Sequence, residues 1–335
     1  MLTFALFGAG RIGQIHAANL VGSRETRLKH VVDVSDAAAR VLAARHGAKV
    51  SQRDEVFSDR EVGAVIIASS TDTHADLAIA AAKAGKAIFC EKPIDLSLSR
   101  VDTCLAAVKA SGVPMQVGFN RRFDPEFREL KSRLDAGAIG GVEQVIISSR
   151  DPGLPPRAYL EVSGGQFRDM TIHDFDMARW LLGEEPEELF VYGSALVDPS
   201  LGEIGDVDSA MVLMRTRSGR LAHINNSRRA SYGYDQRIEV HGSKGRLIAG
   251  NRLRSTVEQA DGEAVKSEKP LHFFLERYAQ AYRNELKEFV EAVTTGAPVP
   301  VGPEDGRMAL VLAEAAVLSM KEHRPVKLAE AAAQA

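Results

Sequence analysis

Cysteine is almost absent from this sequence: Cys90 and Cys104 are the only two among 335 residues. Two cysteines cannot build a disulfide framework or a cysteine-based zinc site, and such scarcity is typical of a reducing compartment. Long apolar runs are absent as well, since no stretch reaches the roughly 18 residues of a membrane-spanning helix. The amino terminus shows no basic and apolar secretion signal. These absences together predict a cytoplasmic protein.

An excess of one charge is also missing. The chain has 42 Lys and Arg against 45 Asp and Glu, a formal net charge of −3, with both signs interspersed. Without a basic stripe, nucleic acid and anionic membranes are poor partners. The remaining composition, 45% hydrophobic and 26% charged, is that of a globular protein with room for two domains. A small molecule is therefore the expected ligand.

Up to about residue 119, strand-like apolar runs alternate with helical patterns. This alternation predicts a doubly wound parallel sheet, in which each crossover is long enough for a βαβ unit. The predicted strands are residues 3–7, 28–33, 63–68, 87–90 and 114–118, and the predicted helices are residues 12–21, 35–46, 73–84 and 97–111.

The first turn of this pattern reads Gly8-Ala9-Gly10-Arg11-Ile12-Gly13. Between a strand and a helix, such glycines allow a tight turn and the close approach of a pyrophosphate, which the helix N-terminus attracts. Asp33 ends the second strand 20 residues after Gly13, where a carboxylate can bind the adenosine ribose hydroxyls. The pattern predicts a Rossmann domain over residues 1–119 that binds NAD. Arg11 and nearby Ser35 keep NADP open as an alternative.

Two later strand ends are polar and should face the same crevice, because ligands of open α/β sheets bind outside the carboxyl ends of the strands. The first is followed by Ser69-Ser70-Thr71-Asp72-Thr73-His74 and the second by Glu91-Lys92-Pro93. A lysine held by a proline at a strand end is unusual in a core, although a solvated surface lysine remains the alternative. The domain boundary is expected between residues 119 and 120, just before Asn120-Arg121.

Residues 120–335 are predicted to form an α+β domain. Their alternating runs suit an open, largely antiparallel sheet with one face against helices and the other free to meet a second subunit. The later of two C-terminal helices is apolar enough to pack back against the first domain. The predicted strands are residues 142–148, 187–197, 207–216, 219–227, 236–241 and 246–249, and the two helices are residues 272–294 and 304–322.

Within this domain, Asp169 and His173 stand four apart where a helix should begin, and Gly183 should end that helix. On one helix face, Asp169 can accept from free backbone N–H groups while His173 presents its ring for proton transfer. The plainer interpretation is a capping aspartate beside a core histidine. Asp174 and Asp176 would suggest metal ligands beside His173, but no second histidine has ligand spacing, so no metal is predicted.

Two adjacent arginines, Arg228 and Arg229, precede Tyr232-Gly233-Tyr234. Basic residues beside aromatic ones occur in RNA-binding surfaces. Here the neighbouring residues alternate as a strand and the whole chain is mildly acidic, so a sheet-edge or subunit contact is the favoured interpretation.

Five segments, in the same order, resemble the family of glucose-fructose oxidoreductases, inositol dehydrogenases and rhizopine-catabolism proteins. They are GAGRIG, TDTH, EKP, GFNRRFDP and SGGQFRDMTIHDFD. The EKPI, DMTIHDFDMAR and YGYDQRIEVHGSKG segments are most similar to bacterial inositol 2-dehydrogenases. One departure is Ser149-Arg150-Asp151-Pro152, where some members have a histidine and an asparagine. This departure bears on the identity of the substrate.

The resemblance implies NAD as cofactor, a homotetramer, and three groups of site residues. The implied catalytic residues are Lys92, Asp169 and His173. The implied substrate-binding residues are these three together with Asn120, Arg121, Asp151 and Tyr234. The cofactor-binding residues, from the glycine motif, the strand ends and the resemblance together, are Gly8, Gly10, Arg11, Ile12, Gly13, Asp33, Ser70, Thr71, His74, Glu91 and Lys92.

The expected reaction is oxidation of myo-inositol to 2-keto-myo-inositol (scyllo-inosose) by hydride transfer to NAD. His173 is the expected general base, Lys92 orients the reacting oxygen and stabilises its charge, and Asp169 supports the pair. The alternatives are another inositol isomer or an aldose such as glucose, an NAD-dependent glycosidase, and a non-catalytic NAD sensor. Net NADH formation separates a dehydrogenase from the last two.

Overall fold

A computed structural model describes residues 1–334 of the chain, and residue 335 lies outside the described part. The chain forms two compact units. The first comprises Met1–Phe123 and Ala281–Leu310, and the second comprises Asp124–Gln280 and Val311–Gln334. The division differs from the predicted boundary in two ways. It falls after residue 123, and a returning segment that the sequence pattern assigned to the second domain belongs to the first unit.

The first unit is built on a six-stranded sheet in the order β3-β2-β1-β4-β5-β6. Every adjacent pair is parallel, which confirms the predicted doubly wound sheet. Among these strands, only the two-residue β3 had no counterpart in the prediction. The strands are β1 (Leu2–Phe7), β2 (Thr26–Val32), β3 (Lys49–Val50), β4 (Ala64–Ile67), β5 (Ala87–Cys90) and β6 (Met115–Val117).

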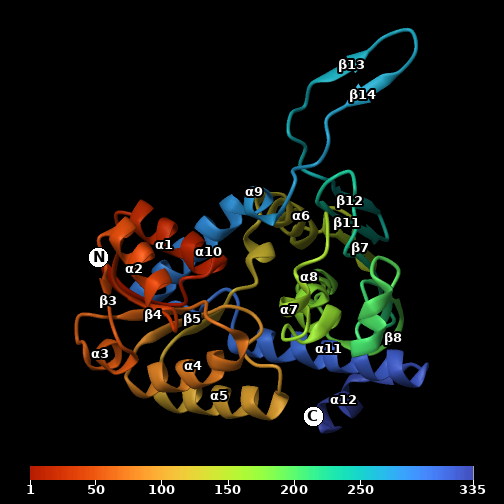
Figure 1. The fold of residues 1–335 in the computed structure, drawn as a ribbon. Coiled ribbons are helices and arrows are strands. Elements are labelled where there is room, and N and C mark those ends of the chain that lie inside the picture. Colours follow the sequence, from red (N-terminus) through yellow and green to blue (C-terminus); the bar gives the residue numbers. More distant parts are fainter. Residues whose placement is uncertain (335) are drawn as a thin grey trace. The chain divides into compact units, whose positions relative to one another are not determined.

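Helices cover both faces of this sheet, so the interior strands β4 and β5 are buried throughout. Figure 1 shows α1, α2 and α10 on one face and α4 and α5 on the other. Phe289 of α10 packs its ring 6.2 Å from that of Phe4 and 5.6 Å from that of Phe89, between centroids. The returning segment thus completes this core. The helices are α1 (Arg11–Gly22), α2 (Asp36–His46), α3 (Arg53–Ser58), η1 (Thr71–Thr73), α4 (His74–Lys83), α5 (Leu98–Ser111), η2 (Asn120–Phe123) and α10 (Ala279–Thr295).

The second unit is built on a seven-stranded sheet in the order β12-β11-β7-β10-β9-β8-β15. All adjacent pairs are antiparallel except β7 and β10, which confirms the predicted, largely antiparallel α+β domain. A separate hairpin, β13–β14, extends away from this sheet (Figure 1). The strands are β7 (Val142–Arg150), β8 (Pro186–Ser194), β9 (Ser209–Thr216), β10 (Leu221–Ser227), β11 (Asp235–Gly242), β12 (Gly245–Ala249), β13 (Glu258–Ala260), β14 (Val265–Ser267) and β15 (Val326–Lys327).

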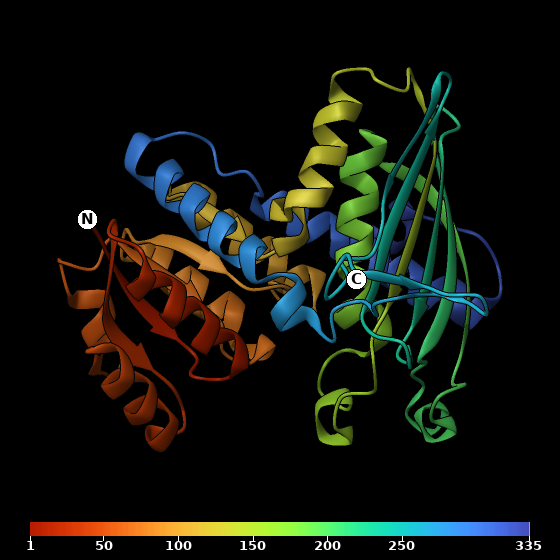
Figure 2. The same cartoon turned by 90° about the horizontal axis from the view of Figure 1, so that it is seen from above.

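One face of the seven-stranded sheet is buried and the other is exposed, because side chains alternate along each strand. Helices α6 and α8 lie on the buried side (Figure 2). On the other side, the register places six residues in one row across six strands, and Leu213 and Ile248 of this row are 56% and 55% exposed. We call this set the exposed row; it consists of Phe190, Leu213, His223, Ile146, Glu239 and Ile248.

Two predicted helices differ in detail from the observed ones. The helix predicted over residues 272–294 is divided into α9 and α10 at Tyr278, whose φ of −106° and ψ of 12° interrupt it. The helix expected to begin at Asp169 instead starts with a π-helical turn. The helices of the second unit are α6 (Pro125–Asp135), α7 (Arg157–Leu160), η3 (Phe167–Thr171, π-helical), α8 (Ile172–Leu182), η4 (Pro199–Ile204), α9 (Phe274–Arg277) and α12 (Leu328–Gln334), and α11 (Pro303–Glu322) begins in the first unit and ends in the second.

Within residues 1–334, no helix combines the length and the apolar character needed to cross a bilayer.

Candidate functional site

The glycine motif forms the turn between β1 and α1, and its glycines have different tasks. Gly8 has a φ of +103°, and a Cβ there would lie 2.3 Å from the carbonyl oxygen of Ala68. A Cβ on Gly13 would lie 2.0 Å from the carbonyl oxygen of Gly8. These two glycines therefore allow the loop to pack against β4 and the helix to pack against the loop.

Gly10 differs from these two glycines, because a Cβ on it would meet no atom of the described chain within 4 Å. It stands at the N-cap of α1, with φ −70° and ψ −168°. The first N–H groups of a helix have no partner within the helix, and a pyrophosphate site uses such groups. The missing side chain at position 10 keeps that approach open.

Asp33 lies at the end of β2 beside the glycine turn. Its carboxylate accepts from the backbone N–H of Ala9 at 2.6 Å and from that of Ser35 at 2.7 Å. These bonds fix an acidic group next to the loop, where the sequence motif predicts ribose binding. Arg11, the charged residue within the glycine motif, is exposed at the first position of α1.

The ends of β4 and β5 are joined through His74. This ring is buried, with Nδ1 2.8 Å from the carbonyl oxygen of Pro93 and Nε2 3.1 Å from that of Ser69. His74 thus holds together the two polar loops that were predicted to meet at one edge of the sheet. Ser70 and Thr71 lie in the first of these loops and retain exposed surface. Their contact with a cofactor stays a prediction, as does that of His74.

The second loop carries Glu91 and Lys92. The Glu91 carboxylate is buried and lies 2.7 Å from Nε2 of His16 on α1. Lys92 is only partly buried, and its peptide bond to Pro93 is cis. Glu91 therefore points into the first unit, while the neighbouring Lys92 reaches its surface.

Asn120 and Arg121 lie in η2, directly after β6, and both are buried within the first unit. Two contacts hold this turn: Arg122 donates to Asp305 at 2.8 Å, and Asn284 donates to the carbonyl oxygen of Phe123 at 3.0 Å. The segment is thus fixed beyond the carboxyl end of β6, and the contact of Asn120 and Arg121 with a substrate stays a prediction.

In the second unit, Asp169 lies inside the π-helical turn and not at a helix cap. Its carboxylate accepts from the hydroxyl of Tyr159 at 2.8 Å and from Nη2 of Arg228 at 3.2 Å. The predicted role of Asp169 as a cap for backbone N–H groups is therefore wrong, because the chain is already helical from Phe167. Side chains from distant segments hold it instead.

Arg228 corrects a second prediction. It was assigned to a sheet edge or subunit contact, yet its side chain is 1% exposed and also donates to Oε1 of Gln166 at 2.8 Å. A signal for this was present in the sequence. Alternation along β10 turns Ala222, Ile224 and Asn226 inward, and Arg228 continues the same phase.

His173 occupies the first turn of α8 and retains exposed surface. The start of this helix is fixed to the sheet by Asn226, which donates to Asp174 at 2.9 Å and accepts from the hydroxyl of Thr171 at 2.7 Å. Asp174 is therefore a buried anchor. Ile172, Phe175 and Leu181 of this helix are buried, and Gly183 ends it with a φ of +65°, as predicted.

The remaining predicted substrate residues also belong to the second unit. The backbone N–H of Asp151 donates to the carbonyl oxygen of Ser227 at 2.9 Å. Tyr234 is buried, with its ring edge-on to Phe273 and Tyr278, each 5.9 Å away between centroids. Ser149 is fully buried, and its hydroxyl lies 3.0 Å from Nε2 of Gln236. An effect of Ser149 on substrate choice would therefore act through its neighbours.

The predicted site residues fall into two groups. The glycine motif, Asp33, the strand-end loops and Asn120-Arg121 belong to the first unit; Asp151, Asp169, His173 and Tyr234 belong to the second. In the first unit, Asp33 contacts the glycine loop and His74 joins the two strand-end loops. The joint action of Lys92 with Asp169 and His173 stays a prediction. Sequence reasoning missed Tyr159, Asn226 and Arg228.

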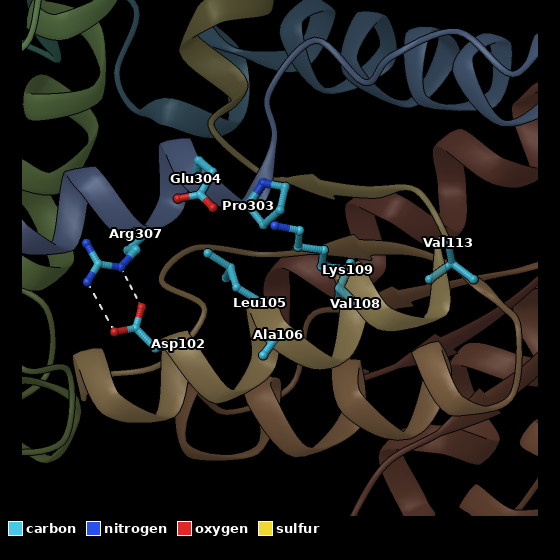
Figure 3. A pocket seen from close by; sticks show the side chains of 10 residues that line it. Asp102, Leu105, Ala106, Val108, Lys109, Val113, Pro303, Glu304 and Arg307 are labelled. Atoms are coloured by element: carbon cyan, nitrogen blue, oxygen red, sulfur yellow. Dashed lines mark hydrogen bonds and ion pairs between the residues drawn. The ribbon is translucent and has the colours of Figure 1, made fainter.

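A surface hollow of the first unit lies between α5 and the start of α11 (Figure 3). Asp102 and Arg307 form an ion pair there, with Nη2 and Oδ2 3.1 Å apart. None of the predicted site residues lines this hollow. We therefore place no catalytic role there.

Two family models match the chain. The model described as "Oxidoreductase family, NAD-binding Rossmann fold" matches residues 2–119, and "Oxidoreductase family, C-terminal alpha/beta domain" matches residues 131–328.

Two relatives match nearly the whole chain. An inositol 2-dehydrogenase of Rhizobium meliloti is 50% identical over 327 residues, which cover 97% of this chain and 99% of the relative. A myo-inositol 2-dehydrogenase of Thermotoga maritima is 48% identical over 331 residues, which cover 98% of this chain and 99% of the relative.

Solved structures are similar over the same length. A myo-inositol dehydrogenase from Corynebacterium glutamicum is 41% identical with a TM-score of 0.94, covering 98% of this chain and 99% of that one. A scyllo-inositol dehydrogenase from Lactobacillus casei, solved with bound NAD(H) and scyllo-inositol, is 27% identical with a TM-score of 0.91, again covering 98% and 99%.

Proposed function

The chain belongs to the oxidoreductase family of glucose-fructose oxidoreductases, inositol dehydrogenases and rhizopine-catabolism proteins, and we propose that it oxidises myo-inositol to 2-keto-myo-inositol with NAD as hydride acceptor. One observation carries the proposal. The relatives that are 50% and 48% identical over 97% and 98% of this chain are named inositol 2-dehydrogenases. The match extends across both family domains.

NAD fits the residues of the first unit. Gly10 leaves the start of α1 open, and Asp33 is fixed beside the loop by Ala9 and Ser35. A carboxylate at this position favours a ribose with free hydroxyls and repels a 2′-phosphate, so NAD is preferred over NADP. When bound, NAD supplies the acceptor for the hydride of the alcohol.

In this reaction, residues of the chain accept the proton of the alcohol and stabilise the charge that develops on its oxygen. We assign His173 as the general base that takes the proton of the reacting hydroxyl. The Lys92 ammonium orients the same oxygen and stabilises the negative charge that develops on it. Asp169 supports this pair electrostatically, and Tyr159 and Arg228 fix its carboxylate.

Substrate recognition is assigned to Asn120, Arg121, Asp151 and Tyr234 together with the catalytic residues. These side chains offer donors and acceptors and few aliphatic groups, which suits a ring with a hydroxyl on every carbon. A site that forms a hydrogen bond to a substrate hydroxyl strongly rejects analogues in which that hydroxyl is missing or misplaced. Discrimination among inositol isomers should therefore be large.

scyllo-Inositol should be tested as a second substrate, because the Lactobacillus casei structure contains bound scyllo-inositol. This chain departs from some inositol dehydrogenases at Ser149 and Asp151, where we place the isomer preference. Asp151→Ala should raise KM for myo-inositol and narrow its advantage over glucose, while the affinity for NAD stays the same.

Assembly is proposed from the exposed row. Leu213 and Ile248 are apolar and exposed on an open sheet face, and such a face is suited to a second copy of the chain. We propose a homo-oligomer, with a tetramer as the form implied by the family. Light scattering on Leu213→Glu should show a smaller particle than the wild type. An unchanged mass would place the interface elsewhere.

We also propose a cytoplasmic location. Cys90 and Cys104 are both buried and free, and burial raises the pKa of the Cys104 thiol to about 12. Such thiols form little thiolate and need no oxidising compartment. Cell fractionation with an antibody against the chain tests this.

The decisive experiment follows NADH formation by the purified protein over a panel of inositol isomers and aldoses. We expect the highest kcat/KM with myo-inositol, and net NADH that grows with turnover. Lys92→Met is the control: it should lose about 10²-fold or more of the turnover and keep NAD binding. A higher kcat/KM with an aldose would contradict the inositol assignment. NAD binding without net NADH would favour the glycosidase or the sensor.

A further inference from the structure

A cluster of titratable residues lies inside the first unit, away from its surface. His16 comes from α1, Glu91 follows β5 and Glu285 comes from α10. One side-chain nitrogen or oxygen atom of each lies within 4.8 Å of the others. His16 and Glu285 are fully buried, and Glu91 is 8% exposed. The cluster therefore joins three segments that are far apart in the sequence.

Glu285 is the unusual member. Among residues 1–334, neither of its carboxyl oxygens has a hydrogen-bond partner that would stabilise a negative charge. An ionised carboxylate in such surroundings is costly, whereas a neutral carboxylic acid is much less so. Burial, and then the nearby negative charge of Glu91, raise the pKa of Glu285 well above its ordinary value of 4.5.

The other two members form a close pair. Nε2 of His16 and Oε1 of Glu91 are 2.7 Å apart, and Gly118 packs so closely that a Cβ on it would lie 2.9 Å from Oε2 of Glu91. The rings of Phe89 and Tyr282 lie edge-on to His16, with centroids 5.0 and 5.9 Å away. These contacts leave the Glu91 carboxylate little freedom to move.

The distance between His16 and Glu91 favours a proton over a metal ion. Two ligands about 2.1 Å from one tetrahedral ion would be about 3.4 Å apart. The observed 2.7 Å is a hydrogen-bond distance.

The cluster connects two parts of the cofactor site. His16 lies one turn beyond Gly13 on the helix that starts at the glycine loop, and Glu91 directly precedes Lys92. The backbone of Glu91 is also paired to β4, through its N–H and the carbonyl oxygen of Ile67 at 2.9 Å. A displacement of Glu91 would therefore reach both the helix at the glycine loop and the lysine.

We propose that Glu285 is a protonated positioning residue, which with His16 holds Glu91 and thereby the loop that carries Lys92. When Glu285 ionises, its carboxylate repels Glu91 and loosens this connection. The groups that face Glu285 are His16 from α1 and Glu91 from the end of β5; Gln116 of β6 donates to its backbone carbonyl, and Tyr282 of its own helix covers His16. The effect on Lys92 rests on the proposed function, whereas the protonation of Glu285 does not.

The proposal fixes the direction of the pH dependence. The folded state keeps the proton of Glu285 at pH values where the unfolded chain has lost it. Its contribution to stability is therefore complete below about pH 4.5, the ordinary pKa, and is lost as the pH rises towards the folded pKa. Within that window, the equilibrium constant for folding should fall about tenfold per pH unit from this group alone.

The test compares the wild type with Glu285→Gln, whose side chain is uncharged at every pH and has the shape of a protonated glutamate. Glu291→Gln, an exposed position on the same helix, is the matched control. Denaturant unfolding and NAD titration, both followed by fluorescence, are measured from mildly acidic to alkaline pH. We expect the folding equilibrium constant of the wild type and of Glu291→Gln to fall about tenfold more per pH unit than that of Glu285→Gln as the pH rises. The NAD affinity of the wild type and of Glu291→Gln should fall only where Glu285 ionises in the folded protein, and that of Glu285→Gln should lack this fall. Equal slopes in all three proteins overturn the proposal.

A measurement on the wild type alone covers the case in which Glu285→Gln does not fold. In protein labelled with carbon-13 at glutamate carboxyl groups, one carboxyl signal should titrate at a pH well above 4.5, the ordinary value. A spectrum in which every glutamate carboxyl titrates near its ordinary pKa overturns the proposal, as does a stoichiometric metal ion that survives dialysis against EDTA. Loss of inositol oxidation with these pH results intact would refute the proposed function and leave the protonated Glu285 standing.

Discussion

The two units of this protein build their parts of the site in different ways. In the first, the groups come from successive ends of parallel strands: the glycine turn after β1, Asp33 after β2, and the loops after β4 and β5. In the second, Asp169 is held by Tyr159 and Arg228, which lie 10 and 59 residues away in the sequence. In the first unit, the order of strands along the chain therefore positions the site residues. In the second unit, contacts between side chains of different segments position them.

This difference has a physical cause. Parallel strands joined by right-handed crossovers all end at the same edge of the sheet, so residues that follow them must gather there. A mixed sheet imposes no such rule. Which inward side chain of β10 meets the π-helical turn depends on how that turn packs, and a motif in the sequence does not encode this packing. Mutations should therefore act differently in the two units.

The largest effect is expected from removing the proton acceptor of the second unit. His173→Asn keeps a polar side chain but no effective base, so kcat should fall about 10²- to 10⁴-fold. The affinity for NAD, whose predicted contacts belong to the first unit, should stay the same. Steady-state NADH formation measures kcat, and fluorescence titration measures the affinity for NAD. A variant that keeps more than about a tenth of the turnover is incompatible with a general-base role.

Breaking a long-range contact should come next. Arg228→Gln leaves Asp169 without its buried cation, and we expect unfolding to become easier by about 2–3 kcal/mol, less than for a fully buried pair because Asp169 is partly exposed. Misplacement of Asp169 should also lower kcat about 10²-fold. Arg229→Gln is the matched control, since Arg229 is exposed. Equal behaviour of the two variants in denaturant unfolding and turnover would remove Arg228 from the site.

Two glycines of the first unit can be separated by the same substitution. Gly13→Ala forces a Cβ against the carbonyl oxygen of Gly8, so we expect a loss of about 1–3 kcal/mol in the free energy of unfolding. Gly10→Ala meets open space and should unfold like the wild type, yet bind NAD about tenfold more weakly. Thermal unfolding and NAD titration check both. Normal NAD binding by Gly10→Ala would show that the pyrophosphate does not approach this position.

The smallest effect concerns cofactor choice. Asp33→Ser removes the charge that repels a 2′-phosphate and keeps an oxygen near Ala9 and Ser35. The ratio of kcat/KM for NADP to that for NAD should rise about tenfold. Initial rates with each cofactor at fixed myo-inositol give this ratio. If it does not change, the ribose contact lies elsewhere.

Most of the first unit could be predicted from the sequence. The positions of its main parallel strands and the glycine turn follow from local patterns, although the two-residue β3 was too short to detect. Predictions in the second unit were right about the sheet and wrong about single residues. Arg228 was interpreted as a surface residue because its charge was given more weight than the alternation of β10.

The sequence by itself determined the fold class and the glycine turn, which depend on periodicity and on neighbouring residues, where backbone sterics and burial act locally. The family and its expected catalytic residues came from the resemblance of five segments. Only the tertiary structure showed that α10 returns to the first core, that Arg228 holds Asp169, and that His16, Glu91 and Glu285 meet. Such contacts join residues tens to hundreds of positions apart. They depend on how whole elements pack, and no spacing along the chain encodes that packing.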